Sequence, residues 1–361
     1  MSNKVMKEDL EYIYWELSDR EKEKFQDSNI VITGAGGFIG YYMLNFLAEN
    51  ASKLQIKSIL ALDTFIFGKP DWINKLSKKF ELLNVQNFNV AINTIADIPN
   101  INKFDSVLHM ASIASPTYYR KHPLVTLDAN VWGLRNMLNF FSRKEIRGFL
   151  NFSSSEVYGD PDQTEVPMNE DYYGNVAING PRACYDEAKR FGETMCYVFN
   201  KEFNMNIVSV RPFNNYGPGM KLDDARAPAD FANSVLMRKN IEIYSDGLST
   251  RTFTYISDAI VGYLKALYYG KFDYFNIGMD HPEITISSLA KIFADKGNEV
   301  FGHKTEIKYL TNKDKEYITN NPRRRSPDIT KAKEKLNFFP KIKVNDGIYR
   351  FLNYLKEEIV K

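Results

Sequence analysis

The sequence contains few cysteines, few histidines and no long apolar run. Its 361 residues include two cysteines and four histidines, and Cys184 and Cys196 both fall in one expected helix. This spacing fits neither a disulfide framework nor a zinc site, so we expect no metal and a reducing, cytoplasmic compartment. No stretch of about 18 apolar residues is available to span a bilayer, which predicts a soluble protein.

An excess of either charge is also missing. The 47 lysines and arginines nearly balance the 45 aspartates and glutamates, for a formal charge of +2. A chain without a basic field has no electrostatic reason to bind nucleic acid or a membrane surface. We therefore expect neither partner.

The first 28 residues mix acidic and basic side chains before any apolar stretch, which is typical of neither a secretory signal nor a transit peptide. Their apolar side chains at helical spacing are Leu10, Ile13, Tyr14 and Leu17. This stripe predicts an amphipathic helix over residues 8–25. It favours packing on the same chain over a contact with another subunit.

Short apolar runs alternate with helical patterns along the rest of the chain. The runs that predict strands are NIVIT, SILALD, SVLHMA, GFLNFSS and NIVSVRPF. Helical patterns between them, such as 126–141 and 185–203, predict a doubly wound, parallel α/β sheet. Beyond the last of these runs, glycine and proline increase and the elements shorten. We expect a helical extension (1–28), a mainly dinucleotide-binding Rossmann domain (29–211) and a mainly substrate-binding lobe (212–361) interleaved with it.

A glycine-rich turn, GAGGFIG, follows the first expected strand and opens a helix. Gly34, Gly37 and Gly40 allow backbone amides to approach an anionic pyrophosphate at the helix N-terminus. Asp63, at the end of the second strand, is placed to accept hydrogen bonds from ribose hydroxyls and to repel the extra phosphate of NADP. The combination predicts NAD as the cofactor, against the alternative of a plain turn with a capping aspartate.

Tyr185 and Lys189 lie four residues apart in YDEAK, on one face of an expected helix. The unperturbed pKa of a phenol is about 10, so Tyr185 needs a nearby ammonium and the positive nicotinamide ring to act as a base. As a base, Tyr185 would take the proton of a sugar hydroxyl. Ser154, at a strand end, would hold that hydroxyl in place for hydride transfer. The alternative is a surface tyrosine beside a solvated lysine.

The motifs GAGGFIG, HMASIASP, SSSEVYGDP, GPRACYDEAKR and TRTFTYISD together resemble an extended short-chain dehydrogenase/reductase that modifies nucleotide sugars. The resemblance extends from residue 29 to the C-terminus and is greatest with the UDP-glucuronate decarboxylases, which make UDP-xylose. It implies an NAD-dependent enzyme with a nucleotide-sugar substrate. It also implies a homodimer joined through the helices at 126–141 and 185–203, although their apolar faces fit an intramolecular core equally well.

The resemblance implies roles for individual residues. The implied cofactor contacts are Gly34, Gly37, Phe38, Ile39, Gly40, Asp63, Ala111, Ser112, Tyr185 and Lys189. The implied catalytic residues are Ser154, Ser155, Glu156, Tyr185, Lys189 and Arg325. The implied contacts to the nucleotide and sugar are Asn214, Arg226, Tyr244, Arg251 and Arg325. For the neighbouring Arg323 and Arg324, a solvated basic loop is the alternative.

The pair formed by Ser155 and Glu156 bears on the reaction. Related dehydratases carry an aspartate before the glutamate, and a serine is a poor proton donor in its place. Simple 4-epimerases generally lack the glutamate, whereas the decarboxylases have this pair. In their reaction, oxidation at C4 makes the sugar a β-keto acid, which loses carbon dioxide before the hydride returns. Glu156, Ser155 and Arg325 would position the carboxylated sugar or manage the proton at C5.

Two substrate-side segments depart from the decarboxylase pattern. NVAING follows YYG where a histidine and an Asn-Pro pair are usual, and Gly219 stands where an arginine is expected. A C4 oxidoreductase, epimerase or dehydratase acting on a different nucleotide sugar is therefore an alternative. A non-catalytic NAD-binding scaffold is a second one, against which the intact Ser154, Tyr185 and Lys189 argue.

Overall fold

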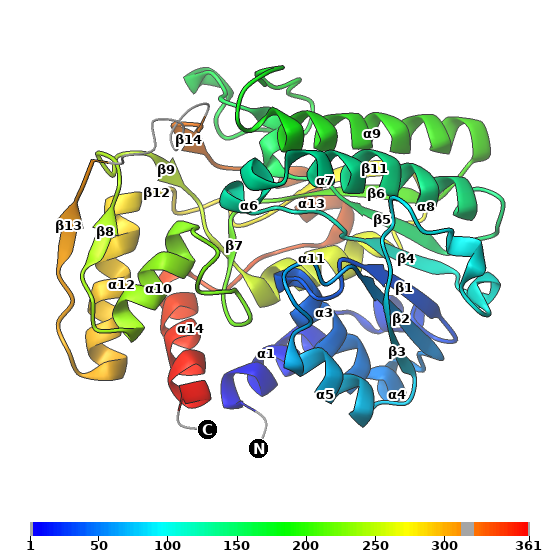
Figure 1. Cartoon of the computed structure of the whole chain (residues 1–361), viewed down its shortest axis with the longest axis horizontal. Coiled ribbons are helices and arrows are strands. Elements are labelled where there is room, and N and C mark those ends of the chain that lie inside the picture. The colour runs from blue at the N-terminus through cyan, green and yellow to red at the C-terminus, as the bar shows by residue number, and fades with distance from the viewer. Residues whose placement is uncertain (1–2, 312–320, 360–361) are drawn as a thin grey trace.

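A seven-stranded parallel sheet forms the centre of the computed structural model, which describes residues 3–311 and 321–359. The strand order is β11-β6-β5-β4-β1-β2-β3 (Figure 1). The strands are β1 (Asn29–Thr33), β2 (Ser58–Asp63), β3 (Leu83–Asn87), β4 (Ser106–His109), β5 (Gly148–Phe152), β6 (Ile207–Pro212) and β11 (Asp273–Ile277). Every neighbouring pair is parallel. The doubly wound sheet predicted from the sequence is thus confirmed.

Each face of the sheet is covered by helices and has its own apolar core. On β1, Ile30 and Ile32 contribute to one core and Val31 to the other. The first core is covered by α3 (Phe38–Glu49), α4 (Ala51–Leu54), α5 (Asp71–Lys79), α11 (Ile256–Leu267) and α13 (Thr330–Leu336). The second is covered by α8 (Leu134–Phe141), α9 (Ala183–Phe203) and the 3-10 turns η1 (Ile95–Asp97) and η2 (Ile101–Lys103). Strands covered on both faces need apolar side chains at successive positions, which explains runs such as SILALD.

The segment 126–141, expected as one helix, contains a π-helical turn. Short α6 (Pro116–Lys121) and α7 (Pro123–Asp128) lead into the π turn η3 (Ala129–Gly133), which continues as α8. A Cβ on Gly133 would lie 2.5 Å from Cγ2 of Val90, so the absence of a side chain permits this close packing. Within the described residues, no helix is both long and apolar enough to cross a membrane.

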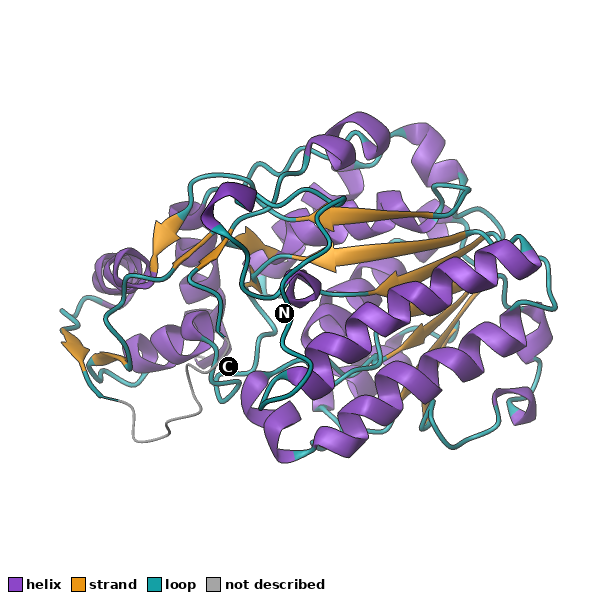
Figure 2. Ribbon diagram, turned by 90° about the horizontal axis from the view of Figure 1, so that it is seen from above, coloured by secondary structure: helices purple, strands orange, loops and turns teal. Residues whose placement is uncertain are grey.

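A smaller lobe faces the carboxyl ends of the sheet strands, toward which the arrowheads point in Figure 2. Its helices α10 (Ala227–Leu236), α12 (Ile286–Phe301) and α14 (Val344–Ile359) share a core that includes Phe231, Phe293 and Phe351. Its short strands are β7 (Asn215–Tyr216), β8 (Ile241–Ile243), β9 (Thr250–Arg251), β10 (Thr254–Tyr255), β12 (Ile284–Thr285), β13 (Ile307–Tyr309) and β14 (Arg324–Arg325). The chain returns to the main sheet for α11, β11 and α13, so the two parts are interleaved.

The N-terminal segment forms two helices, α1 (Lys4–Glu16) and α2 (Asp19–Glu23), which corrects the single helix expected over residues 8–25. Ser18 separates the two helices by starting the second one. Its hydroxyl accepts a hydrogen bond from the amide of Glu21, while the Glu21 carboxylate accepts one from the amide of Ser18. Ile13 is fully buried in the main core, as packing on the same chain requires.

Helix α1 also carries a buried carboxylate that joins distant elements. Asp9 is fully buried and accepts hydrogen bonds from the hydroxyls of Tyr42 on α3 and Tyr255 at the start of α11, both at 2.7 Å. The guanidinium of Arg350 on α14 donates to the other oxygen of Asp9, at 2.7 and 3.0 Å. One side chain of α1 therefore holds both the sheet layer and the smaller lobe.

Candidate active site

A cavity of about 1180 Å³ lies where the sheet strands end and the smaller lobe begins. It exceeds the roughly 300–1,000 Å³ typical of a pocket for one small ligand, so it has room for two. The predicted site residues that line it are Gly34, Gly37, Phe38, Ile39, Gly40, Asp63, Ala111, Ser112, Ser154, Ser155, Glu156, Tyr185, Lys189, Asn214, Arg226, Tyr244, Arg251 and Arg325. The fold thus brings together every residue predicted for the site, while their individual roles stay predictions.

The glycine turn after β1 leaves the N-terminus of α3 accessible from the cavity. Gly34 has a φ of +70°, and a Cβ there would lie 2.7 Å from the carbonyl carbon of Met110. A Cβ on Gly40 would lie 2.3 Å from the carbonyl oxygen of Ala35. Gly37 precedes α3 with no side-chain cap on the first helical amides. Uncapped amides at a helix N-terminus are suited to bind a pyrophosphate.

Asp63 is held rigidly at the end of β2. Its Oδ2 accepts a hydrogen bond from the amide of Gly36 at 2.9 Å, and its Oδ1 accepts one from the amide of Phe65 at 2.7 Å. Each carboxylate oxygen has a second acceptor position, which suits a ribose hydroxyl. Past β4, the buried hydroxyl of Ser112 has no hydrogen-bond partner among the described residues. These features fit NAD on this chain's own donors and acceptors.

The three residues predicted for hydride chemistry line the same cavity, and Tyr185 lies within hydrogen-bonding distance of Ser154. Tyr185 and Lys189 lie one turn apart on α9, and Ser154 follows β5. Both α9 side chains are buried, which excludes the alternative of a surface tyrosine beside a solvated lysine. Lys189 Nζ donates to the carbonyl of Phe152 at 2.7 Å, and the ring of Tyr119 stacks on that of Tyr185 at 5.1 Å.

Burial shifts the ionisation of this pair away from the charged forms. It raises the pKa of Tyr185 to about 12, although hydrogen bonding with Ser154 acts in the opposite direction. Burial also lowers the pKa of Lys189 to about 7. The phenol of Tyr185 is therefore protonated at neutral pH in this structure, and it needs added positive charge in the cavity to become a base.

Glu156 is clamped between two arginines. In the 3-10 turn η4 (Ser155–Tyr158), its Oε2 lies 2.5 Å from Nη2 of Arg182 and 2.6 Å from Nη2 of Arg325. Burial disfavours the charged form, but the two guanidiniums overcome this and lower the pKa of Glu156 to about 2. Glu156 is thus a carboxylate at physiological pH, and it has no proton to donate while both arginines hold it.

Arg182 lines the cavity and Asp186 contacts it from behind the wall, and sequence reasoning missed both residues. They flank Tyr185, with Arg182 just before α9 and its Nε 3.4 Å from Oδ2 of Asp186. Burial and the charge of Glu156 raise the pKa of Asp186 to about 7, against the effect of Arg182. The available signal was an arginine and an aspartate four residues apart on either side of the tyrosine, a spacing that places them on one helix face.

The substrate side of the cavity holds a buried arginine bonded to neutral oxygens. Arg251 donates to the carbonyls of Thr250, Pro322 and Arg323 and to the side chain of Asn321. Burial, and next the neighbouring Arg325, lower the pKa of Arg251 to about 9. A buried cation of this kind is suited to an anionic ligand, because an anion would offset its desolvation.

The other predicted substrate contacts lie around the same part of the cavity. Arg226, before α10, forms a bidentate pair with Asp224 at 2.6 and 2.7 Å. Asn214 has a φ of +44° and donates to the carbonyl of Thr252 at 2.8 Å. Tyr244 is more exposed, and its hydroxyl donates to Glu242. All three line the same cavity as the glycine turn.

The basic run at 323–325 divides into three different environments. Arg325 is buried against Glu156, and Arg324 forms a bidentate pair with Glu283 at 2.6 and 3.0 Å. Arg323 is exposed at the cavity wall, and its backbone amide donates to Asp160. The solvated-loop alternative therefore does not hold for Arg324.

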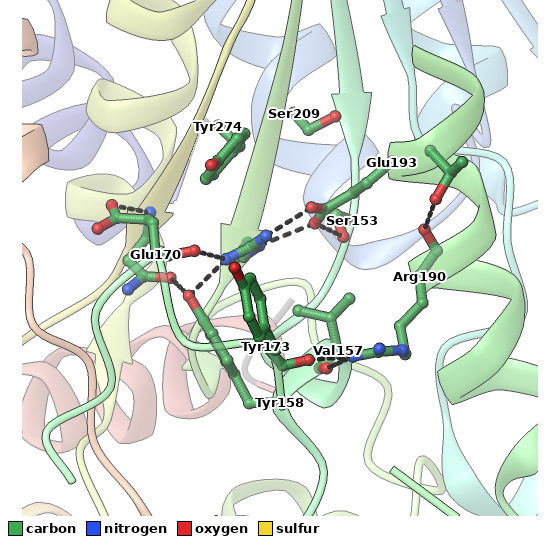
Figure 3. Close-up of polar contacts among 12 residues, drawn as sticks. Ser153, Val157, Tyr158, Glu170, Tyr173, Arg190, Glu193, Ser209 and Tyr274 are labelled. Atoms are coloured by element: carbon green, nitrogen blue, oxygen red, sulfur yellow. Dashed lines mark hydrogen bonds and ion pairs between the residues drawn. The ribbon is translucent and has the colours of Figure 1, made fainter. Parts of the chain in front are cut away.

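A buried network behind the cavity joins α9 to the end of β5. Arg211 on β6 donates to both carboxylate oxygens of Glu193, at 2.8 and 2.6 Å, and to the hydroxyl of Tyr158 at 2.7 Å. Ser153 donates to Glu193 at 2.5 Å, and the carbonyl of Glu170 accepts from Arg211. Figure 3 shows Ser153, Glu193 and Tyr158 in this network. The helix that carries Tyr185 is thereby fixed to the segment that carries Ser154 and Glu156.

In the described ranges, no group of three or more histidine, cysteine, aspartate or glutamate side chains is placed to hold a metal ion. The polar atoms of this site are instead backbone amides, hydroxyls, guanidiniums and isolated carboxylates.

The chain is similar to known proteins of one family. Residues 30–278 match the model of the NAD dependent epimerase/dehydratase family. UDP-glucuronic acid decarboxylase 5 of Arabidopsis thaliana is 34% identical over 335 residues, covering 92% of this chain and 91% of that protein. UDP-glucuronic acid decarboxylase 1 of Xenopus tropicalis is 32% identical, covering 95% and 74%.

Solved structures show the same fold. The UDP-glucuronic acid 4-epimerase of Bacillus cereus, in complex with UDP-glucuronic acid and NAD, has a TM-score of 0.76 and is 25% identical, covering 91% of this chain and 99% of that one. The UDP-glucose 4-epimerase of Thermotoga maritima has a TM-score of 0.79 at 24% identity, covering 92% and 99%. The chain that carries the glycine turn, Asp63 and the buried Ser154, Tyr185 and Lys189 thus belongs to the NAD-dependent epimerase/dehydratase family and is an NAD-dependent enzyme.

Proposed function

We propose that this enzyme decarboxylates UDP-glucuronate to a UDP-pentose through a 4-keto intermediate, with no net oxidation. The observation that carries the proposal is the clamp of Arg182 and Arg325 on Glu156, directly beside Ser154, Ser155 and Tyr185. Paired guanidiniums suit a substrate with a carboxylate. The relatives named UDP-glucuronic acid decarboxylase, at 32–34% identity over most of this chain, support the same reaction.

The first step is removal of the proton from the 4-hydroxyl by Tyr185. Ser154 holds that hydroxyl, and its own Oγ is oriented by a hydrogen bond from the amide of Glu156 at 3.2 Å. NAD, when bound, accepts the C4 hydride, returns it later, and adds positive charge near the phenol. That charge, with Lys189 fixed on Phe152, favours the phenolate over the buried phenol.

The second step is loss of carbon dioxide from the β-keto acid. The bond between C5 and C6 breaks as carbon dioxide leaves, and its electron pair moves into the C4 carbonyl, whose oxygen is held by Ser154 and the protonated Tyr185. The resulting enolate then takes a proton from water at C5. Glu156 is ionised and remains a carboxylate while the two arginines hold it, so it positions groups and does not supply the proton at C5. Ser155, buried at the wall of the cavity, offers a hydroxyl that can position the carboxylated sugar, because a serine is itself a poor proton donor.

A second candidate is 4-epimerisation of the same uronate without loss of carbon. The likeness to the Bacillus cereus 4-epimerase that was solved with UDP-glucuronic acid and NAD favours this candidate. Epimerisation requires the ketone to present its other face to the hydride while the carboxylate survives. A net C4 oxidoreductase on another nucleotide sugar would instead accumulate NADH.

Mass spectrometry of the products separates these reactions. The purified enzyme is incubated with UDP-glucuronate and NAD, and Tyr185→Phe serves as the inactive control. A UDP-pentose, lighter by carbon dioxide, would establish decarboxylation, whereas a product of unchanged mass and different retention would establish epimerisation. Unchanged UDP-glucuronate would contradict the proposal and direct the search to other nucleotide sugars.

We also propose that the enzyme is a cytoplasmic homodimer that pairs through η3–α8 and α9. These elements expose large apolar side chains, among them Trp132, Phe191 and Tyr197. Both cysteines are free thiols, as in a reducing compartment. Sedimentation that shows only monomer at micromolar concentration would contradict the dimer.

A further inference from the structure

Arg182 and Arg325 both direct their guanidiniums at a single oxygen atom. Their Nη2 atoms lie 2.5 and 2.6 Å from the same Oε2 of Glu156, and both side chains are about nine-tenths buried. A guanidinium has five N–H donors in a planar fork that matches two oxygens of an anion. With both Nη2 atoms directed at one oxygen, Nε of Arg325 has no hydrogen-bond partner among the described residues, while Nε of Arg182 is directed at Asp186.

Unpartnered polar atoms gather around this clamp. Within the described residues, Nη2 of Arg182 and Nε of Arg325 are buried without a hydrogen-bond partner, and so are the Tyr119 hydroxyl and Oδ1 of Asp186. The ion pair of Arg182 with Glu156 is close, but it lacks hydrogen-bond geometry. Buried polar atoms are almost always satisfied in folded proteins, so a cluster of exceptions points to a missing group.

The charges around Glu156 also favour one more anion. Arg182, Arg325 and Arg251 all act on the carboxylate of Glu156. The second carboxylate, Asp186, has a pKa raised to about 7 by burial and by Glu156, so it is partly protonated at neutral pH. Besides Glu156 and Asp186, the three buried guanidiniums have Asp160 near Arg251, so the shortage of negative charge lies at Arg182 and Arg325, where an additional carboxylate would improve the balance.

Arg182 lines the cavity, whereas Asp186 lies behind it, outside the cavity wall. The guanidinium of Arg182 is 5.9 Å from the ring of Tyr119, which in turn stacks on the catalytic Tyr185. Arg182 therefore reaches the cavity beside the reacting position, and Asp186 holds its Nε from the protein side.

We propose that Arg182 is a specificity-determining residue that, together with Arg325, binds the carboxylate of the sugar, and that Asp186 is the positioning residue that aims it. This inference rests on the proposed function, because it assigns a contact to the uronate. The substrate carboxylate accepts from the unused donors of both arginines, and the guanidiniums screen it from Glu156. A nucleotide sugar without a carboxylate leaves those buried donors unpaired.

Binding measurements with three ligands test the assignment. Titration calorimetry is done on the NAD-loaded Tyr185→Phe enzyme, which prevents turnover, with UDP-glucuronate, UDP-glucose and UDP. Losing charge-assisted hydrogen bonds of about 1.5–3 kcal/mol corresponds to roughly 10- to 100-fold in affinity. We expect Arg182→Gln to weaken UDP-glucuronate by that factor, to change UDP-glucose and UDP by less than about twofold, and Arg182→Lys to recover part of the loss.

Asp186→Asn is expected to lower the same preference for UDP-glucuronate over UDP-glucose, by a smaller factor. The matched control is Arg143→Gln, an exposed arginine just after α8, which should keep the preference of the parent enzyme. Because the readout is a ratio between ligands bound by one protein, a general loss of folding does not imitate it.

Two outcomes would overturn the inference alone, provided that the wild-type enzyme converts UDP-glucuronate. One is an unchanged preference in Arg182→Gln, and the other is an equal weakening of all three ligands, which would place Arg182 at the diphosphate. If the parent enzyme binds UDP-glucose as tightly as UDP-glucuronate and the wild type does not convert the uronate, the proposed function fails as well.

Discussion

Replacing Glu193 with glutamine tests whether the Arg211 pair holds the catalytic helix to the sheet. In the native contact, Oε2 of Glu193 accepts from Nη2 of Arg211 at 2.6 Å, while Oε1 accepts from Nε and from Ser153. A glutamine can keep the Oε1 contacts, but its amide nitrogen then faces Nη2, donor against donor. Arg211, which is 8% exposed, loses its carboxylate partner.

The size of the effect follows from burial and from what Arg211 retains. Removing one partner of a buried ion pair costs about 3–5 kcal/mol. Arg211 keeps two neutral acceptors, the Tyr158 hydroxyl and the Glu170 carbonyl, so we expect the lower end, about 3 kcal/mol. At an unfolding entropy of roughly 2.1 cal/mol/K per residue, a chain of 361 residues then loses about 4 °C in Tm.

Differential scanning calorimetry measures this shift. Glu187→Gln is the matched control, because this glutamate lies on the same helix with its side chain 38% exposed and 3.8 Å from Arg190, and it should change stability by less than about 0.5 kcal/mol. The double variant Glu193→Leu with Arg211→Met should recover part of the loss, because neither buried charge remains. Equal Tm values for Glu193→Gln and Glu187→Gln would refute the coupling between Glu193 and Arg211. It would also be refuted if the effects of Glu193→Leu and Arg211→Met simply added in the double variant.

Three further predictions concern the cavity. Tyr185→Phe should lower turnover by at least about 10²-fold while NAD binding, measured by calorimetry, stays within twofold; full activity would exclude Tyr185 as the base. The pKa of Glu156 is lowered by its arginines to about 2 in the folded state, below the unfolded value of about 4.3, so its contribution to stability is complete above about pH 5 and is lost as pH falls toward 2. The Tm difference between wild type and Glu156→Gln should shrink over that range, and a pH-independent difference would contradict the clamp. Asp63→Asn removes the carboxylate that repels a 2′-phosphate, so the ratio of NADP affinity to NAD affinity, measured by fluorescence titration, should rise about tenfold. An unchanged ratio would mean that Asp63 does not contact the ribose.

The sheet and the cofactor turn were predictable because their signals are local. Apolar runs such as NIVIT read directly as covered strands, and the glycines of GAGGFIG coincide with a φ of +70° at Gly34 and with backbone packing at Gly40. The break at Ser18 was missed because apolar side chains at helical spacing continue across it. The capping box between Ser18 and Glu21 nevertheless starts a new helix there.

The clamp on Glu156 required tertiary structure. Arg182 and Arg325 lie 26 and 169 positions from Glu156 in the sequence, and only the packing of α9 and β14 against η4 brings them to one oxygen. The Arg211–Glu193 pair is similar, since a strand arginine and a helix glutamate give no pattern that distinguishes them from surface charges. Sequence reasoning therefore placed the residues of the site but not the ion pairs that set their charge states.

The buried Asp9 of α1 also has a consequence for the order in which the chain matures during synthesis. Its partners Tyr42, Tyr255 and Arg350 are translated progressively later, and the last belongs to α14, the final helix of the described chain. Domains tend to fold from their N-terminal side as they leave the ribosome, yet a carboxylate cannot be buried before its donors exist. Helix α1 is thus made first among the described elements, yet Asp9 does not have its full set of hydrogen-bond donors until Arg350 of α14 has been made.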